Sequence, residues 1–250
     1  MSRRSICTGA ICAALVVVLA GNAGAFQPTK VIDDGVEVVL NGGFRPQKLP
    51  RSKLAPITFE VSGKIRTLDG KHLPALKEVV LDTDKNGTIN AKGVPKCTSG
   101  KLQAQTTANA KKACGPALVG KGVTTAEVEF PEQPPINVNS TLLAFNGGKK
   151  GGTTTIFIHA FFSSPVNGAI VTTVKVSKHK SGRYGTRSIA SIPKIAGGFG
   201  SVKSFELTFN RPGYLLAKCP DGHLNAKATS VFSGGKELTG SFVRSCTPKG

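Results

Sequence analysis

The residues whose types and spacing best match a known chemistry lie between Asp82 and Thr88, in the segment DTDKNGT. Side chains with oxygen atoms alternate along this segment and a glycine follows them, which is the pattern of a loop that wraps a calcium ion. The predicted ligands are Asp82, Asp84, Asn86 and Thr88. Such a loop normally ends in a bidentate glutamate, and Gly93 stands at that position here. The pattern therefore predicts an incomplete calcium site, and the alternative is an Asx-rich turn between two strands.

Histidine is scarce, with 4 residues in the whole chain, so acid–base chemistry near neutral pH has few candidates. His159 lies in the apolar segment 156–162, and we expect it to be a hydrogen-bonded residue of the core. His223 follows Asp221 in the segment CPDGH, where an acid–histidine pair and a Pro-Asp-Gly turn both fit, and we favour the turn. The sequence motifs of serine hydrolases, nucleotide-binding loops and HExxH metalloproteases are absent. The sequence therefore predicts no catalytic residue and, apart from calcium, no cofactor.

Of the 6 cysteines, the ones beyond residue 25 are Cys97, Cys114, Cys219 and Cys246. An even number of cysteines in an exported chain is typical of disulfides, and four cysteines allow three pairings. Their order in the chain favours Cys97–Cys114 and Cys219–Cys246, because each pair encloses a short segment. A zinc site built from four cysteines usually has close C-x-x-C pairs, which do not occur here. The spacing therefore predicts two disulfides.

The elements that must position these residues are predicted to be strands. Valine, threonine, isoleucine and phenylalanine are abundant, and turn signals recur about every 8–12 residues. The expected strands after the first turn-rich part are 56–66, 78–82, 117–130, 138–146, 153–162, 169–178, 184–192, 202–210, 213–219, 224–232 and 237–246. A short helix is expected near 106–113, between Cys97 and Cys114, with Thr106 as its N-cap.

This pattern predicts an all-β fold, an antiparallel β-sandwich with one short helix, and a closed barrel is the alternative. Residues 26–55 are expected to form an extended lead-in with one strand at most. Residues 56–250 are expected to form the β-sandwich domain, in which two sub-sandwiches would meet near residues 131–137. The segment 153–162 is apolar on both faces, so we expect it at the centre of a sheet.

Residues 1–25 have the three parts of an export signal. Arg3 and Arg4 are followed by an apolar run, and Ala23 and Ala25 occupy the two small-residue positions of a cleavage site. The apolar run is shorter than the roughly 20 residues that cross a bilayer. We therefore expect cleavage after Ala25 and no transmembrane anchor in the mature chain. The expected location is secreted or extracellular, and association with the cell wall is compatible with it.

The chain is strongly basic, with 33 Lys and Arg against 14 Asp and Glu and a net charge of +19. Removal of Arg3 and Arg4 with the signal leaves +17. Such a charge favours anionic envelope polymers or polysaccharide as partners, and the alternative is that it only keeps the protein soluble. The chain has no Trp and only 2 Tyr, which does not favour stacking on sugars or on single-stranded nucleic acid. No sequence-specific nucleic-acid motif is present, and the oligomeric state is not predicted.

Several short segments suggest a resemblance. They are GVPKC at 93–97, ACGPALVGKG at 113–122, LLAFNG at 142–147 and the closing RSC at 244–246. On these residues the chain resembles uncharacterised secreted β-rich proteins of high-GC actinobacteria that have two cysteine pairs. The resemblance covers most of the mature chain. It implies an exported β-rich domain with paired cysteines and implies no particular activity.

Signal, cysteines and charge together predict an exported, non-catalytic protein that acts at or near the cell envelope through its basic surface. Two alternatives belong to other functional classes. A secreted hydrolase would need acids or histidines that converge in a pocket. An adhesion module supported by calcium would use the segment 82–88.

Overall fold

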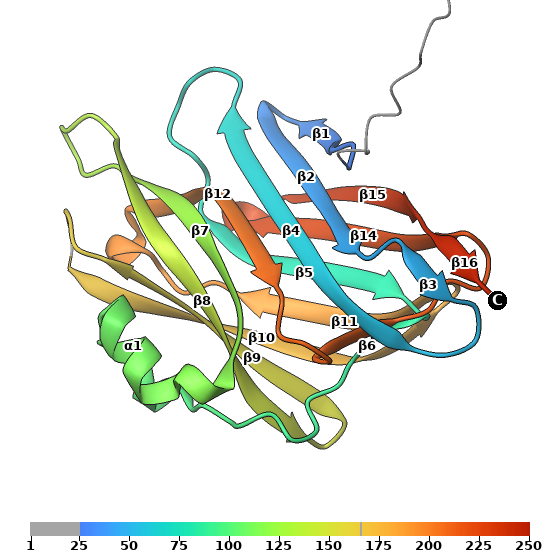
Figure 1. Ribbon diagram of the computed structural model, residues 1–250. Coiled ribbons are helices and arrows are strands. Elements are labelled where there is room, and N and C mark those ends of the chain that lie inside the picture. The colour runs from blue at the N-terminus through green and yellow to red at the C-terminus, as the bar shows by residue number, and fades with distance from the viewer. Residues whose placement is uncertain (1–25, 166) are drawn as a thin grey trace, which may run out of the picture.

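The computed structural model describes residues 26–165 and 167–250, and the predicted export signal, residues 1–25, lies outside the described residues. Strands dominate the described part (Figure 1). The long strands are β1 (Thr29–Asp33), β2 (Val36–Arg45), β4 (Ala55–Thr67), β5 (Leu76–Asp84), β7 (Leu118–Val128), β8 (Ile136–Lys150), β9 (Thr153–Phe162), β10 (Gly168–Ser181), β11 (Tyr184–Ser191), β12 (Gly200–Phe209), β14 (His223–Phe232) and β15 (Glu237–Ser245). The short ones are β3 (Lys48–Pro50), β6 (Gly87–Ile89), β13 (Leu215–Ala217) and β16 (Thr247–Lys249).

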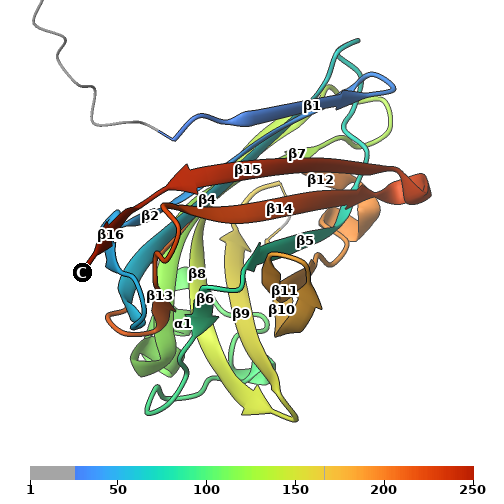
Figure 2. The same ribbon diagram turned by 90° about the vertical axis from the view of Figure 1, so that its right-hand side faces the viewer.

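The long strands form one antiparallel sheet in the order β1-β2-β4-β12-β7-β8-β9-β10-β11-β5-β14-β15. Hairpins connect β7 to β11 in succession, whereas β12 and β5 pair with strands far away in the sequence. The sheet curls until its first and last strands lie side by side, and Figure 2 shows β1 along β15. Twist and β-bulges, such as those in β12 and β8, provide this curvature.

The all-β class, the antiparallel sheet and the short α-helix between Cys97 and Cys114 are confirmed. A division into two stacked sheets is not evident, because the strand pairing continues from β1 to β15 and the sheet is nearly barrel-shaped. Close packing of backbones contributes to this shape. Gly122 on β7 lies directly against the backbone of Glu206 and Leu207 on β12, where a Cβ atom would collide with main-chain atoms.

Much of residues 26–55, the expected lead-in, belongs to this sheet, while β3 pairs with β16 in a separate two-stranded parallel sheet. The lead-in contributes β1 and β2, and β2 pairs with β4 from Val36 to Arg45. The segment 131–137, where two sub-sandwiches were expected to meet, includes the connection from β7 to β8 and the start of β8, and these two strands pair directly with each other. Strand pairing therefore runs through both predicted boundaries.

Inward and outward faces alternate along the strands, as the pleat of a strand requires. On β15 the buried residues are Leu238, Gly240, Phe242 and Arg244, and the residues between them are exposed. Strand β9 is central, as its two apolar faces predicted. Ile156 faces the interior of the curled sheet, whereas Phe157 packs against the cluster around α1 (Thr107–Cys114) on the outside.

His159 is fully buried, and its Nε2 lies 2.9 Å from the backbone oxygen of Gln105. The expectation of a hydrogen-bonded core histidine is therefore confirmed. Desolvation lowers the pKa of His159, so the ring is neutral near pH 7. Thr106 caps α1 as predicted, because its Oγ1 accepts a hydrogen bond from the backbone N–H of Asn109 at 3.2 Å.

Both predicted disulfides are present, Cys97–Cys114 and Cys219–Cys246. The first connects the end of α1 to the segment that leads into it, with a Cα–Cα distance of 5.6 Å. The second connects Cys219, between β13 (Leu215–Ala217) and β14, to Cys246 directly after β15, with a Cα–Cα distance of 6.1 Å. Within the described residues, no helix has both the length and the apolar character needed to span a membrane.

Candidate ligand-binding cavity

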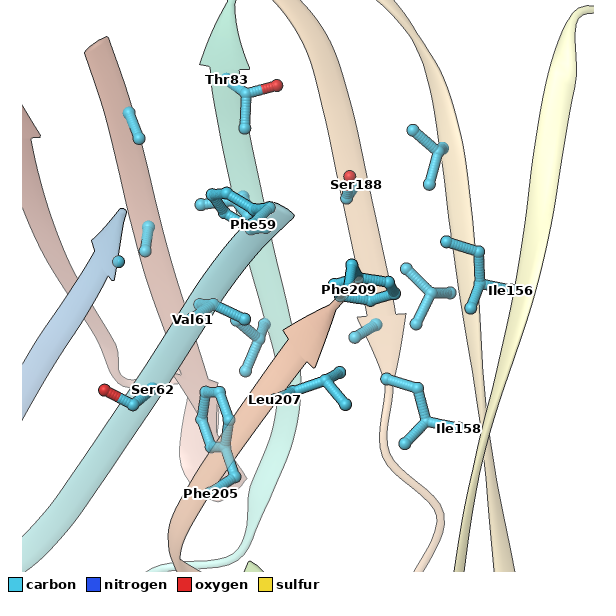
Figure 3. Close-up of a pocket in the computed structure, with 18 of the residues that line it drawn as sticks. Phe59, Val61, Ser62, Thr83, Ile156, Ile158, Ser188, Phe205, Leu207 and Phe209 are labelled. Carbon is cyan, nitrogen blue, oxygen red and sulfur yellow. The ribbon is translucent and has the colours of Figure 1, made fainter. Parts of the chain in front are cut away.

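The curled sheet encloses a cavity of about 300 Å³. Its wall is mostly apolar and is built by side chains from strands that are distant in sequence (Figure 3). Among the residues that point into it are Phe59 and Val61 from β4, Phe205, Leu207 and Phe209 from β12, and Ile156 and Ile158 from β9. The sheet thus surrounds a space that apolar side chains line without filling it.

The size of the cavity follows from the number of strands and from small residues on the wall. A closed sheet of about 8 strands has an interior that side chains can fill or that holds one small ligand, and here the main path has twelve strands. Several inward positions have small side chains: Gly42, Ala160, Ala190, Ala226 and Ala228. Protein interiors are ordinarily close-packed, with few voids larger than a water molecule. A space of this size is therefore a feature of the molecule that calls for a functional explanation.

A few polar side chains interrupt the apolar wall. The hydroxyl-bearing residues Thr83 and Ser188 lie on neighbouring strands, β5 and β11 (Figure 3). Among the described residues that line the cavity, the charged ones are Asp84 and Arg244. A mostly apolar wall with a small number of polar groups is typical of sites for small molecules.

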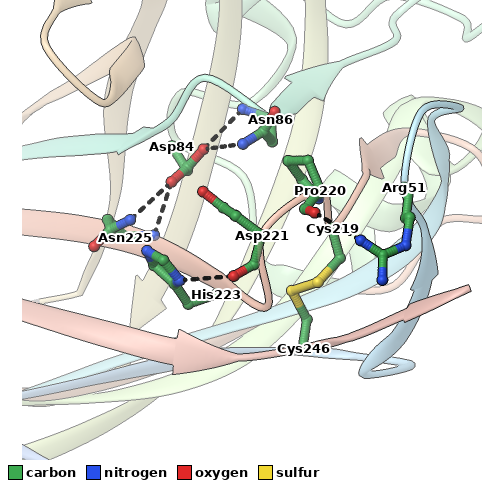
Figure 4. Close-up of a disulfide and its surroundings, with 9 residues drawn as sticks. All are labelled: Arg51, Asp84, Asn86, Cys219, Pro220, Asp221, His223, Asn225 and Cys246. Atoms are coloured by element: carbon green, nitrogen blue, oxygen red, sulfur yellow. Dashed lines mark hydrogen bonds between the residues drawn. A yellow bond between two sulfur atoms is a disulfide. The ribbon is translucent and has the colours of Figure 1, made fainter.

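The carboxylate of Asp84 is satisfied by four amide donors (Figure 4). Its Oδ1 accepts hydrogen bonds from the backbone N–H of Asn86 at 2.9 Å and from Asn86 Nδ2 at 2.8 Å. Its Oδ2 accepts from the backbone N–H of Asn225 at 3.1 Å and from Asn225 Nδ2 at 3.0 Å. Asp84 therefore holds the turn after β5 against β14, which is the Asx-type role of such a residue.

Asp82 lies on the opposite face of β5, because its neighbours Leu81 and Thr83 are the ones that line the cavity. Its carboxylate accepts hydrogen bonds from Arg187 Nε at 2.7 Å and Arg187 Nη2 at 2.9 Å, and Lys227 Nζ lies 3.3 Å away. The Arg187 guanidinium, more than Lys227, holds the pKa of Asp82 below its usual value.

The structure thus brings together Asp84 and Asn86 of the predicted calcium ligands, while Asp82 is paired with cations on the other face and Thr88 is exposed on β6. No group of three or more His, Cys, Asp or Glu side chains suited to a metal occurs in the described part. Calcium binding by these four residues stays a prediction. A rise in melting temperature on addition of calcium would confirm it, and an unchanged melting temperature would contradict it.

One cluster of acids and a histidine was not predicted from the sequence. His72 Nδ1 lies 3.1 Å from Glu127 Oε1 and 2.9 Å from Glu129 Oε2, and Lys203 Nζ lies 3.3 Å from Glu127 Oε2. The cluster fastens the loop between β4 and β5 to β7 and β12, and the backbone N–H of Leu73 also donates to Glu127. None of these residues lines the cavity. The sequence signal for this cluster was the position of Glu127 and Glu129 on one face of a predicted strand. That signal did not predict that the loop with His72 would contact them.

His223 does not pair with the carboxylate of Asp221. Its Nδ1 lies 3.2 Å from the backbone oxygen of Asp221, within the turn that precedes β14 (Figure 4). The geometry is that of the Pro-Asp-Gly turn favoured from the sequence.

Comparison of the chain with protein-family models gives no match. Comparison with curated proteins and with solved structures also gives no match. The resemblance to secreted actinobacterial proteins therefore stays a prediction from the segments that suggest it. The function is inferred from the chemistry of the cavity itself.

Proposed function

We propose that this protein binds an apolar small molecule, of the class of lipid acyl chains, inside the curled sheet. The observation that supports this proposal is the cavity of about 300 Å³ with its wall of Phe, Leu, Ile and Val side chains. Sites for small molecules are typically concave, mostly apolar and about 300–1,000 Å³ in volume. Transfer of an apolar chain from water into such a wall is favourable in proportion to the area buried, by about 25 cal/mol per Å².

The proposed role is binding and not catalysis. General acid–base chemistry requires a side chain that can transfer a proton at the substrate. Asp84, the carboxylate on the cavity wall, is committed to four amide donors, and the His72 cluster lies away from the wall. An apolar ligand held by these residues would be stored or carried unchanged.

The cavity can be tested with a neutral, apolar fluorescent dye whose emission increases in an apolar environment. We expect saturable binding to the wild-type protein. Ala190→Phe places a large ring on the cavity wall and should weaken dye binding by at least about tenfold, which corresponds to roughly 1.4 kcal/mol. Ser191→Phe is the matched control, because the next residue of β11 is exposed and points away from the cavity. Absence of dye binding to the wild type, or equal binding by both variants, would contradict the proposal.

A second candidate function is association with anionic polymers at the cell envelope, and the net charge of +17 after loss of the predicted signal favours it. The two disulfides are compatible with an exported protein, since disulfides persist in oxidising compartments. Cavity binding and surface association are compatible with each other in one molecule. Retention on an anionic polysaccharide matrix should decrease steeply from low to high salt, because screening weakens surface electrostatics. Retention that does not depend on salt would contradict the electrostatic proposal.

A further inference from the structure

We infer that the ligand of the cavity is an amphiphile with an anionic head, a carboxylate or a phosphate, and that Arg244 binds this head. The inference rests on the proposed function, because it concerns the polar end of the same ligand. It depends on the position of Arg244, on the partners of its guanidinium and on the absence of a counter-ion among the residues that the structure describes.

Arg244 occupies the last inward-facing position of β15. The preceding inward residue, Phe242, also lines the cavity, so the wall changes from apolar to cationic over two residues of one strand. The residue is only 9% exposed, and it is the cation among the described residues that line the cavity. A ligand with an extended apolar chain and an anionic end would match this change from an apolar to a cationic wall.

The guanidinium lies where the curled sheet closes. Strand β1 pairs with β2 only as far as Leu40, so the next residues of β2 have no β1 partner. Arg244 spans this gap: Nε donates to the backbone oxygen of Gly42, and Nη2 donates at 2.9 Å to both Asn41 Oδ1 and the backbone oxygen of Gln27. Nη1 donates to the backbone oxygen of Val243 at 3.0 Å. Arg244 therefore helps to hold β15 against β2, and a test must separate this structural role from ligand binding.

All four hydrogen-bond acceptors of Arg244 are neutral oxygens. No carboxylate of the described residues lies within 4.0 Å of its guanidinium, whereas the buried acids Glu37 and Asp82 each face two cations. A guanidinium has five N–H donors, so one N–H on Nη1 has no acceptor in the described part. The rings of Phe242 and Phe26 lie 4.8 Å and 5.4 Å from the guanidinium carbon, which stabilises the cation without neutralising it.

A buried charge without a counter-ion is costly, because it has lost water and gained no opposite charge. Burial lowers the pKa of Arg244 for this reason, although a guanidinium remains protonated at neutral pH. An anionic head at this position would supply the missing charge and an acceptor for the free N–H. Charge-assisted hydrogen bonds from arginine to carboxylate or phosphate are among the stronger polar contacts in proteins.

The test compares three ligands with the same chain and different heads: dodecanoate, dodecyl phosphate and the neutral dodecanol. Their affinities are measured by displacement of the neutral dye and by calorimetry. For the wild-type protein we expect at least one of the two anions to bind roughly tenfold or more tightly than dodecanol, as a hydrogen bond to a charged group would provide. The two anions distinguish a free fatty acid from a lipid phosphate as the source of the head.

Arg244→Gln should remove this preference, so that the anions bind no more tightly than dodecanol while dodecanol binding is retained. Arg45→Gln is the matched control, because it removes the same charge from the general basic field. Arg45 also lies over the ring of Phe26, at 5.8 Å, but it is exposed and does not line the cavity. We expect Arg45→Gln to keep the wild-type preference.

The outcomes separate the inference from the function on which it rests. Equal wild-type affinities for all three ligands would overturn the role of Arg244 and leave the apolar site intact. An Arg244→Gln variant that weakens anions and dodecanol by the same factor would assign Arg244 a structural role only and would also overturn the inference. If neither the dye nor any of the three ligands binds, both proposals fail. If Arg244→Gln does not fold, the inference is decided by the ratio of the wild-type affinities for the anionic ligands and for dodecanol.

Discussion

The buried charged side chains differ in their counter-ions. Glu37 on β2 lies 2.5 Å from both Arg66 Nε and Lys30 Nζ, so it links β2 to its neighbours β4 and β1. Asp82 on β5 is paired with Arg187 on β11 and Lys227 on β14 in the same way. Two acids thus each connect three adjacent strands on the outer face of the sheet. Arg244 has neutral partners only. For this reason we propose that Arg244 binds the ligand, whereas the two acids stabilise the fold.

Glu37 makes the stability of the protein depend on pH. Hydrogen bonds from Arg66, and then from Lys30, lower the pKa of Glu37 from 4.5 to about 2. Because the folded-state pKa is below the unfolded one, this contribution is fully present above the unfolded-state value and is lost as pH falls towards about 2. Glu37→Gln should therefore lose less stability than the wild type between pH 7 and pH 3, as urea unfolding would show. Glu237→Gln, at an exposed acid, is the control, and equal losses in Glu37→Gln and the wild type would contradict the prediction.

At the level of elements, local patterns predicted most strands and both disulfides. Glycine pairs, which are typical of turns, lie inside two of the strands. Asn41-Gly42-Gly43 continues β2, because the two glycines let the rings of Phe242 and Phe26 lie against the backbone. Asn146-Gly147-Gly148 likewise continues β8 through a bulge. There Nδ2 of the fully buried Asn146 donates to the backbone oxygen of Val94, a contact 52 residues away. Contacts of this range decide between turn and strand, and a single sequence does not display them.

The two disulfides should have similar effects on stability and different effects on binding. They enclose sequence separations of 17 and 27 residues. Loop-closure entropy predicts losses of about 3 and about 3.5 kcal/mol when each pair is replaced by alanine. Cys246 follows Arg244 by two residues, so loss of Cys219–Cys246 should also weaken the binding of anionic ligands, whereas loss of Cys97–Cys114 should not. Urea unfolding and ligand titration of the two double variants would check this, and equal binding by both would contradict it.

At the level of the whole molecule, the cavity depends on pairings between distant segments. Strand β12 inserts between β4 and β7, and β5 inserts between β11 and β14, so the wall is complete only when four such pairings have formed. Phe205, Leu207 and Phe209 alternate with polar residues along β12, which is the pattern of a strand with one buried face. This alternation could not show that the opposite wall of the sheet lies too far away for these side chains to contact it. The apolar site is therefore a property of the closed sheet, whereas the sequence pattern indicates buried strand faces and no space between them.

The seam between β1 and β15 has a consequence for the rates at which a ligand enters and leaves. Elsewhere along the sheet, opening the wall would break a ladder of backbone hydrogen bonds. Here β1 pairs with β2 alone, and the described contacts across the seam include Thr29 Oγ1 to the backbone oxygen of Ser241 at 3.2 Å and Lys236 Nζ to Asp34 Oδ2 at 2.8 Å. Local opening is easiest where the fewest such bonds are lost. Lys236→Ala should therefore speed association and dissociation together in stopped-flow measurements and leave the equilibrium affinity unchanged. A change in affinity without a change in rates would place the entry route elsewhere.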